Sequence, residues 1–164
     1  MDLQEFNTLS APDAAQAIRP CLDVQRWIDE IVAARPYASV QDAAGQAERS
    51  GAALTPDEVE QALSHHPRIG ERADGESSEA QLSRGEQAGL GTLDEDVTTH
   101  LARGNAAYEE RFDRVFLIRA AGRTPEEILG ELERRMQNSP EQEAAEVADQ
   151  LTQIAILRLE GLLS

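Results

Sequence analysis

Three short stretches of this chain share one helix-start pattern, and that pattern strongly limits what the chain can fold into. Thr55–Glu58, Thr124–Glu127 and Ser139–Gln142 each place a hydroxyl residue first, proline second, and glutamate or glutamine fourth. The hydroxyl can accept a hydrogen bond from an unpaired amide of the first turn, and proline fits the first helical position. The fourth side chain can reach back to the amide of the cap residue. The pattern predicts helices that begin near residues 56, 125 and 140, and Ser10–Asp13 is a weaker start of the same kind.

Residue composition extends the helical expectation to the whole chain. Ala, Leu, Glu, Gln and Arg dominate, whereas the aromatic residues that favour strands make up only 4%. The apolar spacing and the turn residues predict helices over 3–8, 12–18, 22–34, 39–50, 56–65, 78–89, 93–118, 125–137 and 140–162. The short connections predict a compact all-α bundle of about eight or nine helices, in one domain over residues 1–164. The helix lengths do not recur at a fixed period, which argues against a solenoid.

Charge and composition exclude several classes of function. The chain has 31 acidic and 15 basic side chains, and the net charge of −16 disfavours nucleic acid or an anionic membrane as the main partner. There is no lysine, so a lysine Schiff base with pyridoxal phosphate cannot form. Cys21 is the only cysteine, so no disulfide forms within the chain. The acidic amino terminus lacks the apolar core of a signal peptide, and we expect a soluble cytoplasmic protein.

Two histidines stand before the longest polar stretch, residues 68–79. Pro67 disfavours the helical conformation of His66, so the helix that begins at residue 56 should end there. The His66 ring would then be able to point into a cleft. The alternative is that His65 and His66 only cap the helix, where a cation suits the helix dipole, and position alone favours this interpretation.

A metal site is not expected. His65 and His66 are followed by Glu71 and Asp74, but the spacing that puts two imidazoles on one helical face is absent and there is no cysteine pair. Cys21 lies between apolar neighbours, which is typical of inert packing rather than of a nucleophile.

The stretch Ser83–Gln87 carries a second group of polar side chains. On a helix Ser83, Glu86 and Gln87 lie on one face. This face could be a binding surface in which Glu86 orients a neighbouring imidazole. The commoner alternative is a solvated helix face.

Two long helices each carry one polar residue on an apolar stripe. In the last helix the stripe of Ala144, Val147, Leu151, Ile154 and Leu162 includes Arg158. A buried guanidinium needs a partner, which could be a substrate carboxylate or ureido oxygen, or a structural acid; alternatively the head could reach solvent. In the helix over 93–118 the exception is Asn105, expected to be a hydrogen-bonded structural group. Gly122 would cap that helix, leaving its last carbonyls and the following amides available to a ligand.

Taken together, the motifs resemble a known family. His65–Glu71 followed by Ser83–Leu90 resembles the signature of 2-oxo-4-hydroxy-4-carboxy-5-ureidoimidazoline (OHCU) decarboxylases. The resemblance extends over nearly the whole chain, through Trp27, Arg35-Pro36-Tyr37, Asn105, Tyr108, Phe112, Phe116-Leu117-Ile118, Gly122-Arg123 and Arg158-Leu159.

This resemblance implies an all-α enzyme without a cofactor that converts the ureidoimidazoline to (S)-allantoin and carbon dioxide in urate breakdown. It implies that His66 is the catalytic acid or base and that Glu86 is its partner. The residues implied to line the substrate are Pro67, Ser83, Arg84, Gly85, Glu86, Gln87, Phe116, Leu117, Ile118, Arg119, Ala120 and Arg158. At Arg119 many relatives carry a small or sulfur-bearing residue. A homodimer is expected by analogy with the family.

Two other functions compete with the decarboxylase. The charge of −16 suits a non-enzymatic acidic helical module that binds a basic partner, although such a module needs neither an inward Arg158 nor the His-Pro motif. A metal-dependent hydrolase would use His65, His66 and Glu71, and it would be sensitive to a chelator.

Overall fold

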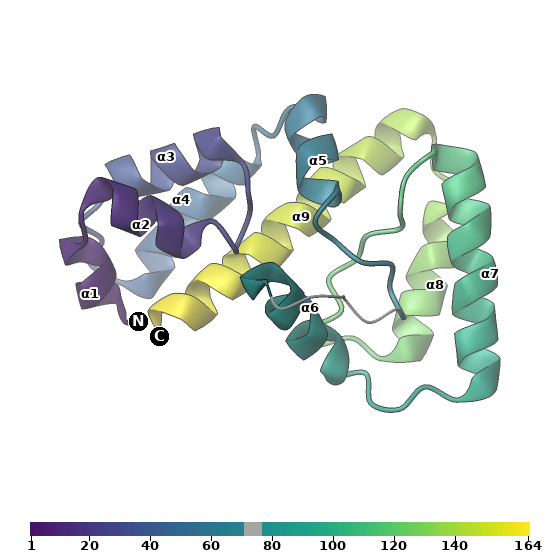
Figure 1. Cartoon of the computed structure of the whole chain (residues 1–164). Coiled ribbons are helices and arrows are strands. Elements are labelled where there is room, and N and C mark those ends of the chain that lie inside the picture. The colour runs from purple at the N-terminus through teal and green to yellow at the C-terminus, as the bar shows by residue number, and fades with distance from the viewer. Residues whose placement is uncertain (71–76) are drawn as a thin grey trace. The chain divides into compact units, whose positions relative to one another are not determined.

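The structure is a computed structural model that describes residues 1–70 and 77–164, and within these residues all regular elements are α-helices (Figure 1). The helices are α1 Leu3–Thr8, α2 Ala11–Ile18, α3 Gln25–Ala33, α4 Val40–Gly51, α5 Pro56–Leu63, α6 Ser78–Ala88, α7 Glu95–Phe112, α8 Pro125–Arg135 and α9 Pro140–Leu163. The all-α class and the expected number of helices are confirmed for the described residues. None of the helices in this part of the chain is long and apolar enough to cross a membrane.

The three helix-start motifs form complete capping boxes. The Thr55 hydroxyl accepts from the amide of Glu58 at 3.2 Å, and the Glu58 carboxylate accepts from the amide of Thr55 at 2.9 Å. The same reciprocal pair caps α8 through Thr124 and α9 through Ser139. Each box satisfies two amides that would otherwise lack a partner, so these starts are set by local sequence alone.

The helix expected over residues 93–118 ends at Phe112, which corrects the prediction at its carboxyl end. Asp113 follows it in the left-handed region, with φ 54° and ψ 39°. The next apolar residues Phe116, Leu117 and Ile118 are 1%, 4% and 5% exposed. A helix on the core surface buries one stripe, whereas an irregular segment inside the core can bury three successive side chains. Gly122 therefore does not cap this helix.

Contacts divide the chain into two units, each described here by itself. The first unit is Met1–Ser64 with Ala148–Ser164, and the second is His65–Val147. Helix α9 contributes residues to both units. The single domain expected over residues 1–164 stays a prediction.

The first unit packs α2 and α4 against α3. Trp27 on α3 is fully buried, and its indole N–H donates to the carbonyl of Ala47 at 3.1 Å. Gly51 at the end of α4 lies so close to Thr152 that an added Cβ would fall 2.4 Å from a side-chain carbon. The absence of a side chain at Gly51 therefore permits this approach.

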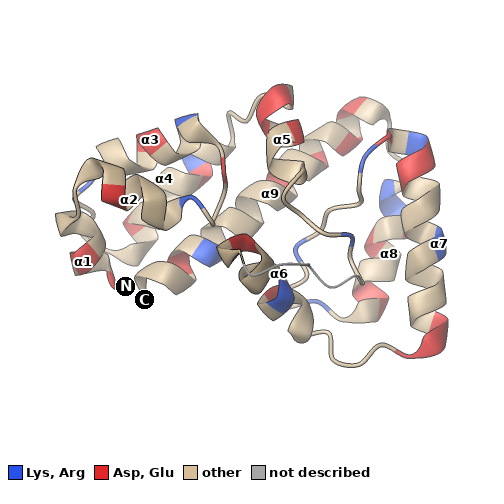
Figure 2. Ribbon diagram, in the orientation of Figure 1, with Lys and Arg blue, Asp and Glu red and all other residues tan. Residues whose placement is uncertain are grey.

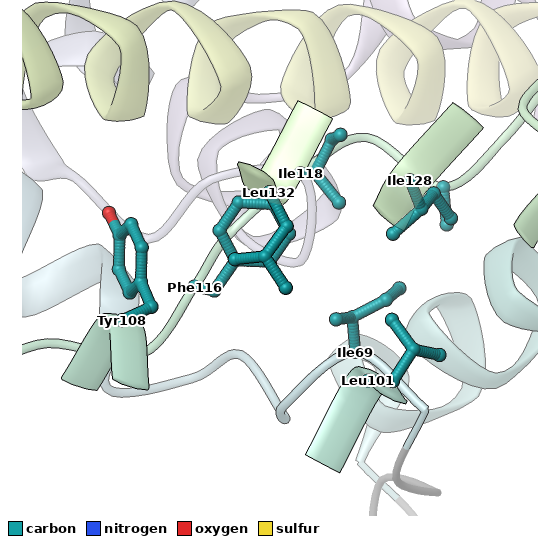
Figure 3. Close-up of a cluster of buried hydrophobic side chains, with 8 residues drawn as sticks. Ile69, Leu101, Tyr108, Phe116, Ile118, Ile128 and Leu132 are labelled. Atoms are coloured by element: carbon teal, nitrogen blue, oxygen red, sulfur yellow. The ribbon is translucent and has the colours of Figure 1, made fainter. Parts of the chain in front are cut away.

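The second unit has a separate apolar core, shown in Figure 3. Its members come from the chain before α6, from α7, from the irregular segment 116–120 and from α8: Ile69, Leu101, Tyr108, Phe116, Ile118, Ala120, Ile128 and Leu132. Helices α7 and α8 approach closely, since an added Cβ on Gly104 would lie 2.2 Å from a methyl carbon of Leu132. Ile69, three positions after His66, therefore belongs to the same core as the segment 116–120.

Acidic side chains are distributed over the helices of both units, and Figure 2 shows them on α1, α3, α5 and α7 among others. Several are paired with arginine, as in the contacts of Arg26 with Glu30 and Glu58. A hydrogen bond from Ser50 and then one from Arg26 lower the pKa of Glu30, and a hydrogen bond from Arg26 is the main cause of the lowered pKa of Glu58. Part of the negative charge therefore takes part in holding helices together.

Candidate active site

His66 lies in an irregular turn between α5 and the core of the second unit. Helix α5 ends at Leu63, and the chain is non-helical at His66 and Pro67, as the proline predicted. His66 and Pro67 are partly buried, whereas His65 is exposed. The two adjacent histidines therefore occupy different environments.

The three residues after Pro67 are attached to α6 and α7 by side chains. The Arg68 guanidinium pairs with Glu109, with Nη2 donating to Oε2 at 3.2 Å. The Ile69 carbonyl accepts from the side-chain amide of Asn105 at 3.0 Å. The Gly70 amide donates to Oε1 of Gln87 at 3.0 Å. These contacts fix the chain immediately after His66.

Asn105 has the structural role that the sequence predicted. It is 6% exposed, on the buried side of α7, and its amide nitrogen bonds the Ile69 carbonyl. Its Oδ1 has no hydrogen-bond donor among the described residues. The polar exception on the apolar stripe therefore serves to hold the His66 segment.

Helix α6 presents the second motif. Ser77 caps the helix by accepting from the Ala80 amide at 3.1 Å. Ser83 is 3% exposed, and Glu86 and Gln87 are partly buried, while Gly85 is exposed. The burial of Ser83 is at odds with a fully solvated helix face, and the polar binding surface stays a prediction.

A cavity of about 650 Å³ lies against the Gly70–Gln87 contact. It is lined by Gly70, Arg84, Gly85, Gln87, Ala88, Leu90, Gly91, Leu93 and Thr98. Three residues predicted to contact substrate, Arg84, Gly85 and Gln87, are therefore on its wall. His66 and the segment 116–120 are not among the described residues that line it. The volume suits a small polar heterocycle.

The segment 116–120 lies inside the second unit, with Phe116, Ile118 and Ala120 in the same apolar cluster as Ile69. Arg119 is partly buried. The Leu117 carbonyl accepts from Nη1 of Arg135 at 2.7 Å. This segment and the chain after His66 thus share one core.

A buried polar network beside this segment was missed by the sequence analysis. Arg135 and Glu143 are each 1% exposed and form an ion pair, and the Tyr108 hydroxyl donates to Glu143 at 2.5 Å. Burial, with a smaller contribution from the Glu143 hydrogen bond, raises the pKa of Tyr108 far above its usual range. The signal was available, because Arg135 continues the stripe of Ile128 and Leu132 on α8. The stripe argument that singles out Arg158 and Asn105 therefore applies to Arg135 as well.

Arg158 belongs to the other unit. It is 7% exposed, as its place on the apolar stripe predicted, and its Nη1 donates to the Pro20 carbonyl at 3.1 Å. Ala144 on the same predicted stripe is exposed. A role of Arg158 toward substrate stays a prediction.

The pairing of His66 with Glu86 also stays a prediction. Both side chains are partly buried and belong to the same unit, and their segments are joined through Gly70 and Gln87. For the metal alternative, Glu71 and Asp74 lie outside the described residues. Within residues 1–70 and 77–164, His, Cys, Asp and Glu form no group of three that could hold a metal ion.

Comparisons with known proteins agree on one family. The family model described as OHCU decarboxylase matches residues 7–160. The 2-oxo-4-hydroxy-4-carboxy-5-ureidoimidazoline decarboxylase of Amia calva is 30% identical, over 99% of this chain and 95% of the relative. The 2-oxo-4-hydroxy-4-carboxy-5-ureidoimidazoline decarboxylase of Haloferax volcanii is 28% identical, over 97% of this chain and 94% of the relative. In the uric acid degradation bifunctional protein of Bacillus sp. strain TB-90, which is 24% identical, this chain spans only 32% of the relative.

Two solved structures resemble the fold. The crystal structure of an OHCU decarboxylase in the presence of (S)-allantoin has a TM-score of 0.71 at 25% identity, over 88% of this chain and 94% of that one. The crystal structure of an (S)-allantoin synthase has a TM-score of 0.72 at 16% identity, over 99% of this chain and 54% of that one. This second similarity concerns the fold alone.

Proposed function

This chain belongs to the OHCU decarboxylase family, and we propose that it decarboxylates 2-oxo-4-hydroxy-4-carboxy-5-ureidoimidazoline to (S)-allantoin and carbon dioxide in urate degradation. The relatives that it covers almost completely carry the name of this activity. The family model also includes residues from both units, which supports treating residues 1–164 as one decarboxylase domain.

One structural observation carries the proposal. The hydrogen bond from Gly70 to Gln87 joins the segment that follows His66 to the helix that carries Glu86. The cavity beside this contact is lined by Arg84, Gly85 and Gln87, from the second motif. Two motifs that are separated in the sequence therefore meet beside a space of the right size for a small heterocycle.

The chemistry needs only positioning of the substrate and proton transfers with a net uptake of one proton. The carbon that carries the substrate carboxylate also carries a hydroxyl and lies next to a C=N bond. When the bond to the carboxylate breaks, carbon dioxide leaves and the electron pair can spread into that C=N bond. The nitrogen of that bond takes up a proton, the hydroxyl releases its proton as it becomes the ring carbonyl, and a proton adds to one face of the neighbouring carbon, which carries the ureido group. The substrate itself accepts the electrons, so the proposed reaction uses no cofactor, and the absence of lysine is consistent with this.

His66 is the proposed acid or base. An imidazole titrates near neutral pH, so it can both take and give a proton under working conditions. Glu86 would fix the tautomer and the orientation of the ring. Such proton transfer contributes on the order of 10²–10⁴ to the rate. Delivery of the proton to one face of the substrate would give a single enantiomer.

The other proposed contacts hold the substrate. The polar groups of Ser83, Arg84 and Gln87 can bond the ureido group, and the segment 116–120 would close the site together with Pro67. The Arg158 guanidinium would bind a carboxylate or ureido oxygen through its paired N–H groups. A cytoplasmic location and a homodimer complete the proposal, and light scattering of the purified protein tests the dimer.

Circular dichroism of the product tests the proposed activity. Freshly generated substrate is followed with wild type, His66→Ala and the neighbouring control His65→Ala. In uncatalysed decay the loss of carbon dioxide leaves a planar intermediate that is protonated on either face, so only an active enzyme gives an excess of (S)-allantoin. We expect wild type and His65→Ala to give this excess and a folded His66→Ala variant to lose it. Full activity of His66→Ala refutes its role, and loss of activity on chelation favours the metal-dependent alternative.

A further inference from the structure

The Arg135–Glu143 ion pair is buried inside the second unit, and stability alone does not account for it. Both side chains are 1% exposed, and Arg135 Nε donates to Glu143 Oε1 at 2.9 Å. Taking two charges out of water is costly, and apolar residues of similar volume often replace such a pair without loss of stability. We therefore expect a buried pair of this kind to fix a particular arrangement of the chain around it.

Glu143 accepts hydrogen bonds from other side chains besides Arg135. Its Oε1 also accepts from the Tyr108 hydroxyl at 2.5 Å, and its Oε2 accepts from the Asn138 side-chain amide at 3.0 Å. Burial and the bond to Glu143 keep the Tyr108 hydroxyl protonated well above its usual pKa. The carboxylate therefore has donors on both oxygens, and Arg135 is left with one orientation.

In that orientation Arg135 holds two successive residues of the irregular segment. Its Nη1 donates to the Leu117 carbonyl at 2.7 Å. Its guanidinium carbon also lies 4.6 Å from the centre of the Phe116 ring, within the range of a cation–π contact. The Phe116 ring in turn packs edge-on against Tyr108, with centroids 5.1 Å apart; both side chains are labelled in Figure 3.

The orientation of the Leu117 carbonyl determines the direction in which the N–H of Ile118 points. The peptide unit is planar and trans, so the carbonyl of Leu117 and the N–H of Ile118 point in opposite directions. With the carbonyl held on Arg135, the Ile118 amide is directed to the other side of the segment. A helix or a sheet would fix such directions by its own hydrogen bonds, but residues 116–120 have no regular structure.

We propose that Arg135, held by Glu143 and Tyr108, is a positioning residue that sets the path of the segment 116–120 along the substrate site. This inference rests on the proposed function, in which that segment lines the substrate. Arg135 itself contacts only protein groups in this role, and it acts through the Phe116 ring and the Leu117 carbonyl.

Three variants test the proposal. Arg135→Lys keeps the charge but lacks the fork that binds Glu143 and Leu117 together. The double variant Arg135→Met with Glu143→Leu removes both charges, so no unpaired ion is left buried. The matched control is Arg134→Lys, since Arg134 is the preceding residue on α8 and is 51% exposed, in a pair with Glu131 and Glu146.

Each variant is examined below its melting temperature by steady-state kinetics, by the enantiomer ratio of the product and by amide NMR of Ile118–Ala120. We expect both Arg135 variants to shift these amides and to speed their hydrogen exchange. We expect kcat/KM to fall by about tenfold or more, mostly in kcat, because small misplacements around a reacting group are costly. Arg134→Lys should stay within about twofold of wild type.

The proposal is overturned if Arg135→Lys and the double variant are both folded and both have wild-type kcat/KM, whether or not the amide NMR signals shift. Activity that falls only with the unfolded fraction, with unshifted amides, also overturns it, because that is a purely structural effect. If wild type and Arg134→Lys are both inactive, the proposed function fails instead. The amide shifts then still decide whether Arg135 sets the segment.

Discussion

The backbone amide of Gly70 donates to the side-chain oxygen of Gln87 at 3.0 Å. This single bond joins the chain that leaves His66 to α6, and it lies on the wall of the cavity of about 650 Å³. Gly70 also has φ +88°, a conformation that side-chain-bearing residues avoid. The contact therefore depends on one glycine and one amide side chain, and both can be changed separately.

Replacing the Gln87 amide tests whether this bond holds the two motifs together. Gln87→Met removes the acceptor and should lower the free energy of unfolding by about 0.5–1 kcal/mol. It should also reduce kcat/KM, whereas Gln87→Glu retains an acceptor and should recover the stability. Urea unfolding and allantoin production measure the two effects. Equal stability of both variants would show that the bond is unimportant in solution.

Gly70→Ala tests the backbone requirement at the same place. Among the described residues an added Cβ meets only Leu101, at the ordinary distance of 3.5 Å, so we expect the cost to come from the positive φ. We expect a loss of about 1–2 kcal/mol in the free energy of unfolding. The matched control is Gly130→Ala, in the middle of α8 with no atom near the added Cβ. It should instead stabilise the protein by about 0.5–1 kcal/mol, and the opposite signs are read from urea unfolding.

Stability should fall at alkaline pH because of the two buried tyrosines. Burial raises the pKa of Tyr37 to about 12, and its hydroxyl donates to the Ile31 carbonyl at 2.7 Å. An unfolded tyrosine titrates near 10. Between about pH 10 and 12 the unfolded state therefore loses a proton that the folded state keeps, so the free energy of unfolding falls as pH rises.

The chain has no lysine to titrate in that interval, so the two tyrosines dominate the alkaline slope. Guanidinium unfolding at pH 9 and pH 11 measures it. Tyr37→Phe should make the slope shallower, since the group that titrates is gone. A slope unchanged in both Tyr37→Phe and Tyr108→Phe would contradict this assignment.

Arg158→Lys tests the proposed contact with substrate. Lysine keeps the charge but not the paired N–H groups, so we expect KM to rise by about tenfold. Arg19→Lys is the control in the same unit, because Arg19 is 33% exposed and pairs with Asp23. Steady-state kinetics on both variants measures the change. A wild-type KM in Arg158→Lys would leave its bond to the Pro20 carbonyl as a structural role only.

Helix starts could be predicted from the sequence because their causes are local. The capping box at Thr124 needs only the three residues that follow it. The end of α7 could not be predicted this way. The apolar run from Phe116 to Ile118 reads as the continuation of a helix, and only its burial within the core of the second unit explains why the helix stops at Phe112.

Some features of the candidate site could likewise be predicted from the sequence, and others could not. The His66 turn and the polar face of α6 follow from proline chemistry and helical spacing. Arg135 was within reach of the stripe argument, but its partners Glu143 and Leu117 are 8 and 18 residues away in the chain. No spacing rule connects those three positions, because the contact exists only after α8 and α9 have packed around the segment.

The left-handed residue Asp113 has a further consequence for how this protein can change over evolutionary time. Beyond this residue the chain leaves α7 and continues through residues 116–120 without regular structure, with the Leu117 carbonyl held by Arg135. If a small ligand is bound by the peptide groups, replacing a side chain there leaves the binding atoms in place. A replacement of the Arg119 side chain would then leave the specificity unchanged.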